Sequence, residues 1–160
     1  MPDIRSAQHQ EHWQAVAMDF VSFSIVDPGT GPEIRIEVNG RPLQHLARDV
    51  EQIHAKAEGT PGLAGTYAGL SPLQIHGTAR HFLGEPQAAW FEDGDTVLMG
   101  CTCGEWGCWP LTAVVLAADD VVRWTNFRTG HRDWDLSGLG PFEFERSQYE
   151  AALSSMRLAL

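Results

Sequence analysis

One stretch of the sequence, residues 96–111, combines two apolar runs with a tight turn and all three cysteines of the chain. It reads TVLMGCTCGEWGCWPL, so that Cys101, Cys103 and Cys108 are placed around the tetrapeptide Gly-Glu-Trp-Gly. Apolar runs on both sides of a glycine-containing turn predict a β-hairpin. The hairpin is expected to belong to a meander of three strands: Thr96–Cys103, Cys108–Ala117 and Val121–Phe127.

A second hairpin is predicted near the N-terminus. Apolar residues alternate with polar or charged ones in a strand expected at Ala15–Ile25 and again over residues 34–38. This period of two places the apolar side chains on one face of a strand. Residues 27–32, Asp-Pro-Gly-Thr-Gly-Pro, are dense in turn-forming types, so we expect the two strands to pair antiparallel.

Two helices are predicted as well. The first begins at Pro42, because proline is tolerated in the first helical turn, and ends before Gly59, a residue suited to a left-handed C-cap. Its expected apolar stripe is Leu43, Leu46, Val50, Ile53 and Ala57. After a short strand around Phe142 to Glu145, Ser147 and Glu150 have the spacing of a capping box. The apolar side of that second helix would carry Tyr149, Leu153, Met156 and Leu160.

These elements predict an α+β fold with a mostly antiparallel sheet of about five or six strands and two helices packed on it. The chain of 160 residues has the length of a single globular domain, and we expect residues 1–12 to be frayed. Residues 59–72 are rich in glycine and proline and are predicted to be a long connection. Residues 73–85 are interpreted as one helical turn followed by an extended piece.

Three interpretations of Cys101, Cys103 and Cys108 remain open. They are buried structural thiols, or they bind zinc with His131 (or His81 or His76) as fourth ligand, or they are redox-active or catalytic. The spacing Cys-x-Cys-x4-Cys differs from the paired Cys-x2-Cys pattern of common zinc sites. The redox interpretation predicts a Cys103–Cys108 disulfide or one nucleophilic thiolate with His131 as base.

The cysteine segment, together with residues 122–127 (VRWTNF) and 138–150 (GLGPFEFERSQYE), resembles a group of small bacterial proteins that share a CxCGxxGCxPL motif. The resemblance covers about the C-terminal third of the chain. It implies a bacterial protein, and it implies no activity. The first ten residues lack the charged and then apolar pattern of a signal peptide, so we expect a cytoplasmic location.

The loop that contains His131 is a second candidate site. Asp133, Trp134 and Asp135 follow the histidine and could line a polar pocket, although a solvated loop with internal ion pairs is the competing interpretation.

The net charge of −10 disfavours general binding to nucleic acid, and no apolar run reaches the roughly 20 residues of a membrane helix. The sequence contains no complete catalytic set. It therefore favours a binding protein over an enzyme, with a basic protein (as for an immunity protein or antitoxin) or a second copy as the expected partner. The alternative is a small zinc- or cysteine-dependent enzyme centred on the cysteine hairpin and His131.

Overall fold

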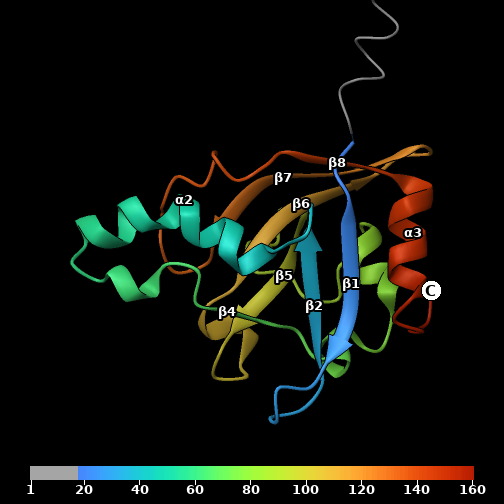
Figure 1. The fold of residues 1–160 in the computed structure, drawn as a ribbon, viewed down its shortest axis with the longest axis horizontal. Helices are drawn as coiled ribbons and strands as arrows, with labels where there is room; N and C mark the ends of the chain where they lie inside the picture. Colours follow the sequence, from blue (N-terminus) through green and yellow to red (C-terminus); the bar gives the residue numbers. More distant parts are fainter. Residues whose placement is uncertain (1–17) are drawn as a thin grey trace, which may run out of the picture.

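The computed structural model describes residues 18–160, which form an α+β fold of eight strands and two α-helices (Figure 1). The predicted fold class is confirmed, and residues 1–12 and the start of the strand predicted from Ala15 lie outside the described part. One sheet has the order β1 (Val21–Val26), β2 (Glu33–Val38), β3 (Arg41–Pro42). The other has the order β4 (Tyr67–Gly69), β5 (Asp95–Cys101), β6 (Leu111–Ala117), β7 (Val121–Thr129), β8 (Phe142–Glu145). All pairs of neighbouring strands are antiparallel.

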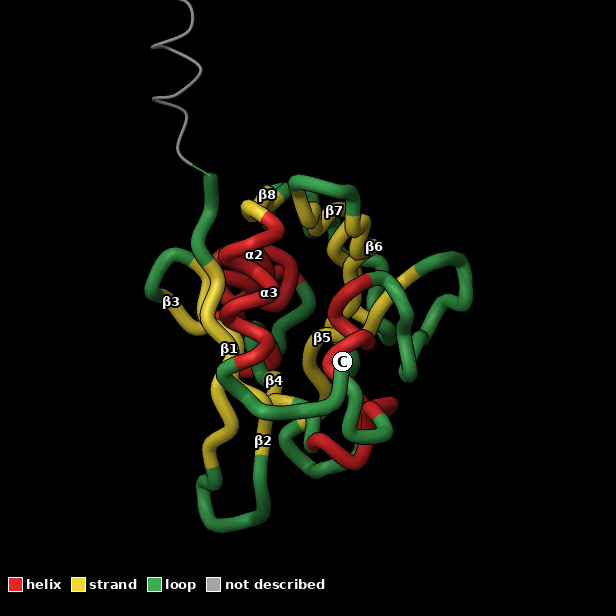
Figure 2. Tube along the Cα trace, turned by 90° about the vertical axis from the view of Figure 1, so that its right-hand side faces the viewer, coloured by secondary structure: helices red, strands yellow, loops and turns green. Residues whose placement is uncertain are grey.

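The β1–β2 hairpin lies opposite the strands β5–β7, with helix α3 (Arg146–Ser154) and helix α2 (Leu43–Ala57) on different sides of the two sheets (Figures 1 and 2). Two backbone hydrogen bonds join the sheets. The amide of Ile34 donates to the carbonyl of Leu70 at 2.7 Å, and the amide of Asp19 donates to that of Glu143 at 2.8 Å. The chain therefore closes around a core that both sheets share.

The centre of the core is aromatic. Trp124 and Tyr149 are fully buried, and the Trp124 indole donates a 3.1 Å hydrogen bond to the Tyr149 hydroxyl. That hydroxyl in turn donates to the carbonyl of Phe82 at 2.6 Å, so the polar atoms of both rings have partners. The aromatic face of the meander is thus covered by the β1–β2 hairpin and α3, with Phe23 packed 6.4 Å from the Trp124 ring.

The apolar stripe predicted for α2 is correct over its first half and wrong over its second. Leu43 is buried and Leu46 and Val50 pack against the core, but Ile53 is 73% exposed and Ala57 is exposed. The fully buried residues recur every four positions: Leu43, Ala47, Glu51 and Ala55. Glu51 can occupy the buried face because its carboxylate accepts hydrogen bonds from the Gly65 amide and the Tyr67 hydroxyl. Glu51, a polar residue with two hydrogen-bond donors as partners, therefore occupies the central position of the buried helix face, where a hydrophobic residue is usual.

Two other predictions of local structure are wrong. The capping box expected at Ser147 does not form, because the N-cap of α3 lies two residues earlier, at Glu145, and Glu150 pairs with Arg146 at 2.8 Å instead. Leu160 lies beyond the helix and is 55% exposed. A capping box occurs instead at the 3₁₀-helix η2 (Pro72–Ile75), where the Gln74 side chain accepts from the Ser71 amide.

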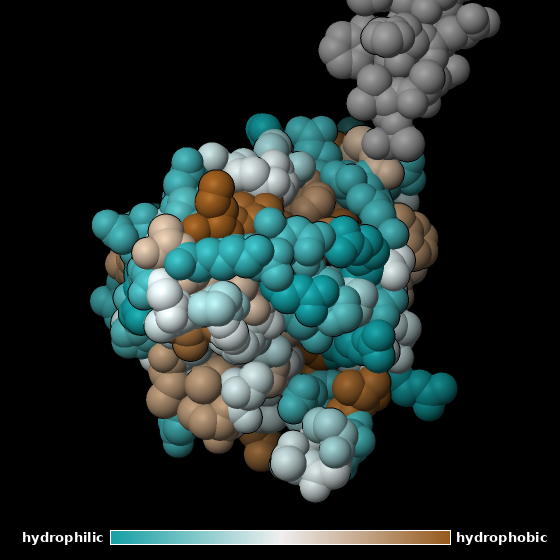
Figure 3. All heavy atoms as spheres, turned by 60° about the vertical axis from the view of Figure 1, so that its left-hand side comes forward, coloured by the Kyte–Doolittle hydropathy of each residue, from teal (hydrophilic) through white to brown (hydrophobic). Residues whose placement is uncertain are grey.

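The connection predicted over residues 59–72 contains the 3₁₀-helix η1 (Pro61–Leu63) and the unpredicted strand β4. The residues that follow form η2 and a further 3₁₀-helix, η3 (Ala79–Leu83), so the expected extended piece near His81 is also wrong. In the described residues, no helix is both long and apolar enough to cross a membrane. The face that Figure 3 turns to the viewer is mostly hydrophilic, with hydrophobic residues in separate spots.

Candidate thiol site

The connection between β5 and β6 is longer than the four-residue turn predicted for it. Strand β5 ends at Cys101 and β6 begins only at Leu111, so Cys103 and Cys108 lie in a loop, residues 102–110, and not on strands. Within this thiol loop, Gly104 has φ +94°, and the 3₁₀-helix η4 (Trp106–Cys108) follows. The loop folds back onto the sheet, because a Cβ placed on Gly100 would be 2.6 Å from the Cα of Trp106.

Cys101, at the end of β5, and the two cysteines of the thiol loop lie close together, and none of the three forms a disulfide in the structure. Cys103 and Cys108 are exposed and Cys101 is half-buried. The Cys103 amide donates to the Cys101 sulfur at 3.4 Å, and the Cys103 thiol donates to the carbonyl of Glu105 at 3.9 Å. The loop thus presents two neighbouring thiols to solvent, with a third behind them.

The thiols differ in acidity. A backbone hydrogen bond at Glu105, followed by hydrogen bonds with the Cys101 and Cys108 thiols, lowers the pKa of Cys103 below that of an ordinary thiol. The pKa of Cys108 is raised, first by its hydrogen bond with Cys103 and then by desolvation and the nearby negative charges, including Glu105. Removal of the first proton from this pair of thiols therefore favours a Cys103 thiolate beside a neutral Cys108 thiol.

Two side chains from elsewhere in the chain hold the thiol loop. The amide of Gln74 donates a 3.0 Å hydrogen bond to the carbonyl of Gly104, and its oxygen is fixed by Ser71. On the other flank, Nε2 of His131 lies 2.8 Å from the carbonyl of Gly107. Since a carbonyl only accepts, His131 uses this nitrogen as a donor to the loop backbone.

His131 sits in a cluster of aromatic rings. It stacks on Trp109 with a centroid distance of 6.3 Å and lies 4.7 Å from Trp90, whose indole donates to the carbonyl of Gly130 at 3.0 Å. The cluster continues to Trp134, at 5.9 Å from Trp109. His131 therefore supports the thiol loop through the backbone of Gly107. Among the hydrogen bonds of residues 18–160, none joins His131 to a cysteine sulfur.

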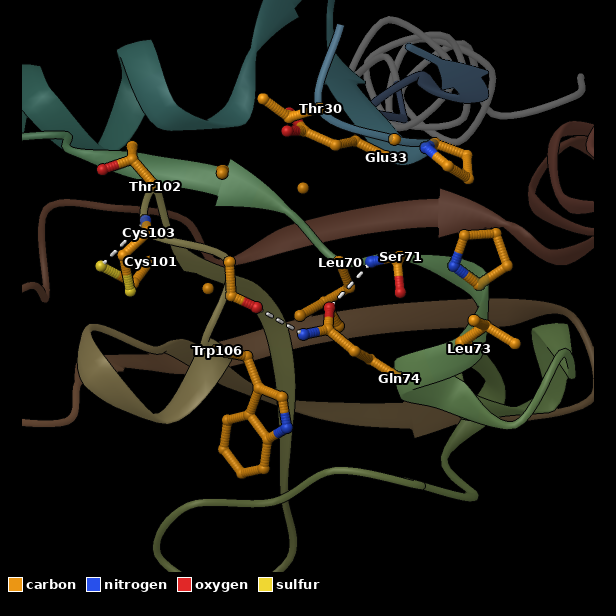
Figure 4. Close-up of a pocket in the computed structure, with 17 residues that line it drawn as sticks. Thr30, Glu33, Leu70, Ser71, Leu73, Gln74, Cys101, Thr102, Cys103 and Trp106 are labelled. Carbon is orange, nitrogen blue, oxygen red and sulfur yellow. Dashed lines mark hydrogen bonds between the residues drawn. The ribbon is translucent and has the colours of Figure 1, made fainter. Parts of the chain in front are cut away.

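A groove of about 370 Å³ begins at the thiols (Figure 4). Cys101 and Cys103 lie at one end of it, with Glu33 from the start of β2 on one side and Gln74 and Trp106 on the other. Cys108 is not part of this lining. The space falls within the range of small-ligand sites in proteins, which is roughly 300–1,000 Å³.

The predicted zinc site is only partly brought together. Over residues 18–160, no three His, Cys, Asp or Glu side chains are arranged to hold a metal ion. His131 donates to a carbonyl, as described, while His81 is buried with both ring nitrogens engaged, by the Val97 carbonyl and the Gln87 amide. His76 pairs with the Gln87 side chain at 2.9 Å. Zinc binding stays a prediction.

The predicted polar pocket at residues 133–135 is also split. Trp134 is buried and its indole donates to Glu58 at 2.7 Å, while the carboxylate of Asp135 caps the Ser137 amide at 2.9 Å. Trp134 and Asp135 line a second groove, of about 420 Å³, to which Asp133 does not belong. Asp133 is exposed.

Sequence reasoning missed three residues that complete the thiol site: Glu33, Gln74 and Trp90. Only the spacing of Ser71 and Gln74 carried a usable signal, since it matches a capping box followed by a helical turn. The other contacts arise from the way β2 and β4 approach each other in the fold.

Comparisons with protein-family models, curated proteins and solved structures found no match to this chain. The resemblance to small bacterial proteins stays an expectation, and any functional conclusion depends on the geometry of the site.

Proposed function

We propose that the thiol loop is a redox-active site that exchanges disulfides, with Cys103 as the attacking thiol and Cys108 as the resolving thiol. The observation that carries this proposal is the presence of two free, solvent-exposed thiols near each other in one glycine-containing loop. Structural cysteines are typically buried, whereas exchange requires a thiol that a second sulfur can approach.

Cys103 is the better nucleophile of the pair. It is exposed, and its lowered pKa favours the thiolate, which is the reactive form in exchange. Cys101 is less suited to either role because it is half-buried at the end of β5 and already accepts the Cys103 amide. Its thiol would instead stabilise the Cys103 thiolate.

Cys108 is placed to resolve the intermediate. The residues between the two cysteines include Gly104 and Gly107, and a Cβ at Gly104 would meet no atom within 4 Å, so this part of the loop has room to adjust. A disulfide between Cys103 and Cys108 would join two exposed sulfurs that are near enough for each thiol to affect the pKa of the other.

The reaction balances without a cofactor. The Cys103 thiolate attacks one sulfur of a substrate disulfide, forms a mixed disulfide and expels the first substrate thiolate. Cys108, on losing its proton, attacks the Cys103 sulfur and expels the second substrate thiolate. The substrate gains two electrons and two protons, while the protein loses the two thiol protons and gains one disulfide.

A trapping experiment with bis(2-hydroxyethyl) disulfide, which is uncharged, tests the proposal. We expect wild-type protein to lose two thiols and show a Cys103–Cys108 link in peptide mapping. Cys108→Ser should accumulate a mixed disulfide on Cys103, Cys103→Ser should react slowly, and Cys101→Ser, the control, should still form the internal link. Failure of wild-type protein to form that link would overturn the proposal.

The zinc prediction concerns the same sulfurs and competes directly with exchange. Metal analysis of protein purified without a histidine tag separates the two. One zinc per chain with three protected thiols would replace the proposal, whereas metal-free protein with reactive Cys103 supports it. Recognition of a basic partner stays a prediction that follows from the net charge of −10, and a homodimer stays a prediction likewise.

A further inference from the structure

The residues that line the groove beside the thiols restrict which ligands can bind there. The apolar residues that line it include Leu73, which is 87% exposed, and Trp106, on the two sides of Gln74 (Figure 4). Apolar residues at two places along a groove are suited to apolar side chains of a ligand.

The charge of the groove is negative. Apart from the thiols, Glu33 is the one ionisable side chain among the residues that line it, and Arg, Lys and His do not occur there. Glu33 forms no ion pair with residues 18–160. Glu105 adds a second carboxylate close enough to raise the pKa of Cys108. The chain as a whole carries a net charge of −10.

This field acts on any disulfide that approaches Cys103. An anionic disulfide, such as oxidised glutathione, is repelled by the two carboxylates and by the thiolate itself. A disulfide flanked by lysine or arginine is attracted, and the walls offer hydrophobic contact to its neighbouring residues. One N–H of the Gln74 amide is already used by the Gly104 carbonyl, and its oxygen accepts from the Ser71 amide.

We infer that the groove binds a polypeptide segment with basic and apolar residues next to the disulfide that Cys103 attacks. The inference rests on the proposed exchange function and assigns its substrate class. Glu33 supplies the charge selection, and Leu73 and Trp106 supply the apolar contact. Exchange would then join a basic protein substrate to this acidic chain through a transient mixed disulfide.

Matched substrates test this selection. Three peptide disulfides identical except for Lys, Gln or Glu beside the cysteine are compared at low salt, with bis(2-hydroxyethyl) disulfide as the uncharged reference. We expect the Lys peptide to oxidise the protein roughly tenfold faster than the Glu peptide. In about 1 M salt, where the Debye length is about 3 Å, the difference should largely disappear.

Two surface substitutions locate the effect. Glu33→Lys should reverse the preference, while Asp119→Asn, in the exposed turn at the far end of β6, should leave it unchanged. Leu73→Gln should raise the peptide concentration needed for half-maximal rate without slowing the small uncharged disulfide.

The outcomes separate the two proposals. Equal rates for the three peptides, with normal formation of the Cys103–Cys108 link by the uncharged reference, would overturn the groove inference alone. No link with the uncharged reference would overturn the exchange function as well. A charge preference that survives Glu33→Lys unchanged would also contradict the inference.

Discussion

The imidazole of His131 donates a hydrogen bond to the carbonyl oxygen of Gly107 across 2.8 Å and thereby ties the loop after β7 to the thiol loop. The same ring stacks on Trp109, which directly follows Cys108. His131 thus acts on the cysteines through the backbone that carries them.

We predict that His131→Ala loosens the thiol loop without unfolding the protein. Loss of this hydrogen bond costs about 1 kcal/mol, so amide exchange at Gly104 and Cys108 should accelerate roughly fivefold. Hydrogen exchange followed by NMR measures this, with His45→Ala, an exposed change on α2, as the control. Equal exchange in the two variants would show that the contact does not hold the loop.

The buried carboxyl of Glu51 predicts a pH dependence of stability. Burial raises its pKa, against the opposing hydrogen bonds from Tyr67 and Gly65. The folded state therefore binds this proton more tightly, and its contribution to stability is fully present below the unfolded-state pKa of about 4.3 and falls as pH rises towards the folded-state value. Glu51→Gln should flatten that decline in urea titrations, whereas the exposed Glu145→Gln should not.

His81 predicts the opposite slope. Burial lowers its pKa to about 4, against the opposing hydrogen bond that Nε2 donates to the Val97 carbonyl. Nδ1 accepts the Gln87 amide and so has no place for a second proton. The unfolded chain protonates near pH 6.5, so about 3 kcal/mol of stability should be lost as pH falls from there towards 4.

Because Glu51 and His81 act in overlapping pH ranges, the His81 prediction is best tested on the imidazole itself. Nitrogen NMR at pH 5.5 should show the neutral ring with its proton on Nε2, while protein unfolded in urea should show protonated histidine. A folded-state titration of His81 near pH 6.5 would refute the prediction.

We predict that adding a single methyl group at Gly69 lowers the stability of the fold strongly. A Cβ at this position would lie 2.2 Å from the carbonyl oxygen of Ile34, where β4 approaches β2. Gly69→Ala must separate the two strands and should cost about 1–3 kcal/mol or more in free energy of unfolding. Gly62→Ala is the matched control, since nothing lies within 4 Å of a Cβ there. Similar urea midpoints for both variants would contradict the packing argument.

The strands that sequence analysis predicted are those in which local pattern and burial agree. Val21 and Phe23 are buried as their alternation requires, and the meander and the strand at Phe142 are present with small shifts of their ends. Strand β4 was not predictable, because Tyr67 pairs with Cys101 and Gly69 needs the close approach of Ile34. Neither the pairing with Cys101 nor the approach of Ile34 can be inferred from the three residues of β4 alone.

The same division applies to the candidate site. Its cysteines were identified because all three lie within eight residues of the chain. His131 was identified because histidine is a common metal ligand and general base. Its actual role, a donor to a carbonyl, depends on the loop conformation that Gly104 and η4 create. Glu33 stood in a strand pattern as one more charged residue, and only the fold places it in the wall of the groove that begins at the thiols.

The hydrogen bond between Asp19 and Glu143 has a consequence for the order in which parts of the chain can fold during synthesis. It joins residues 124 positions apart, and the nearby contact between Val21 and Gln148 spans 127 positions. During synthesis from the N-terminus, β1 leaves the ribosome long before its partners in β8 and α3 exist. The first hairpin must therefore wait with its apolar face uncovered until nearly the whole chain has been made, and this interval is when a chaperone or an early truncation would have the greatest effect.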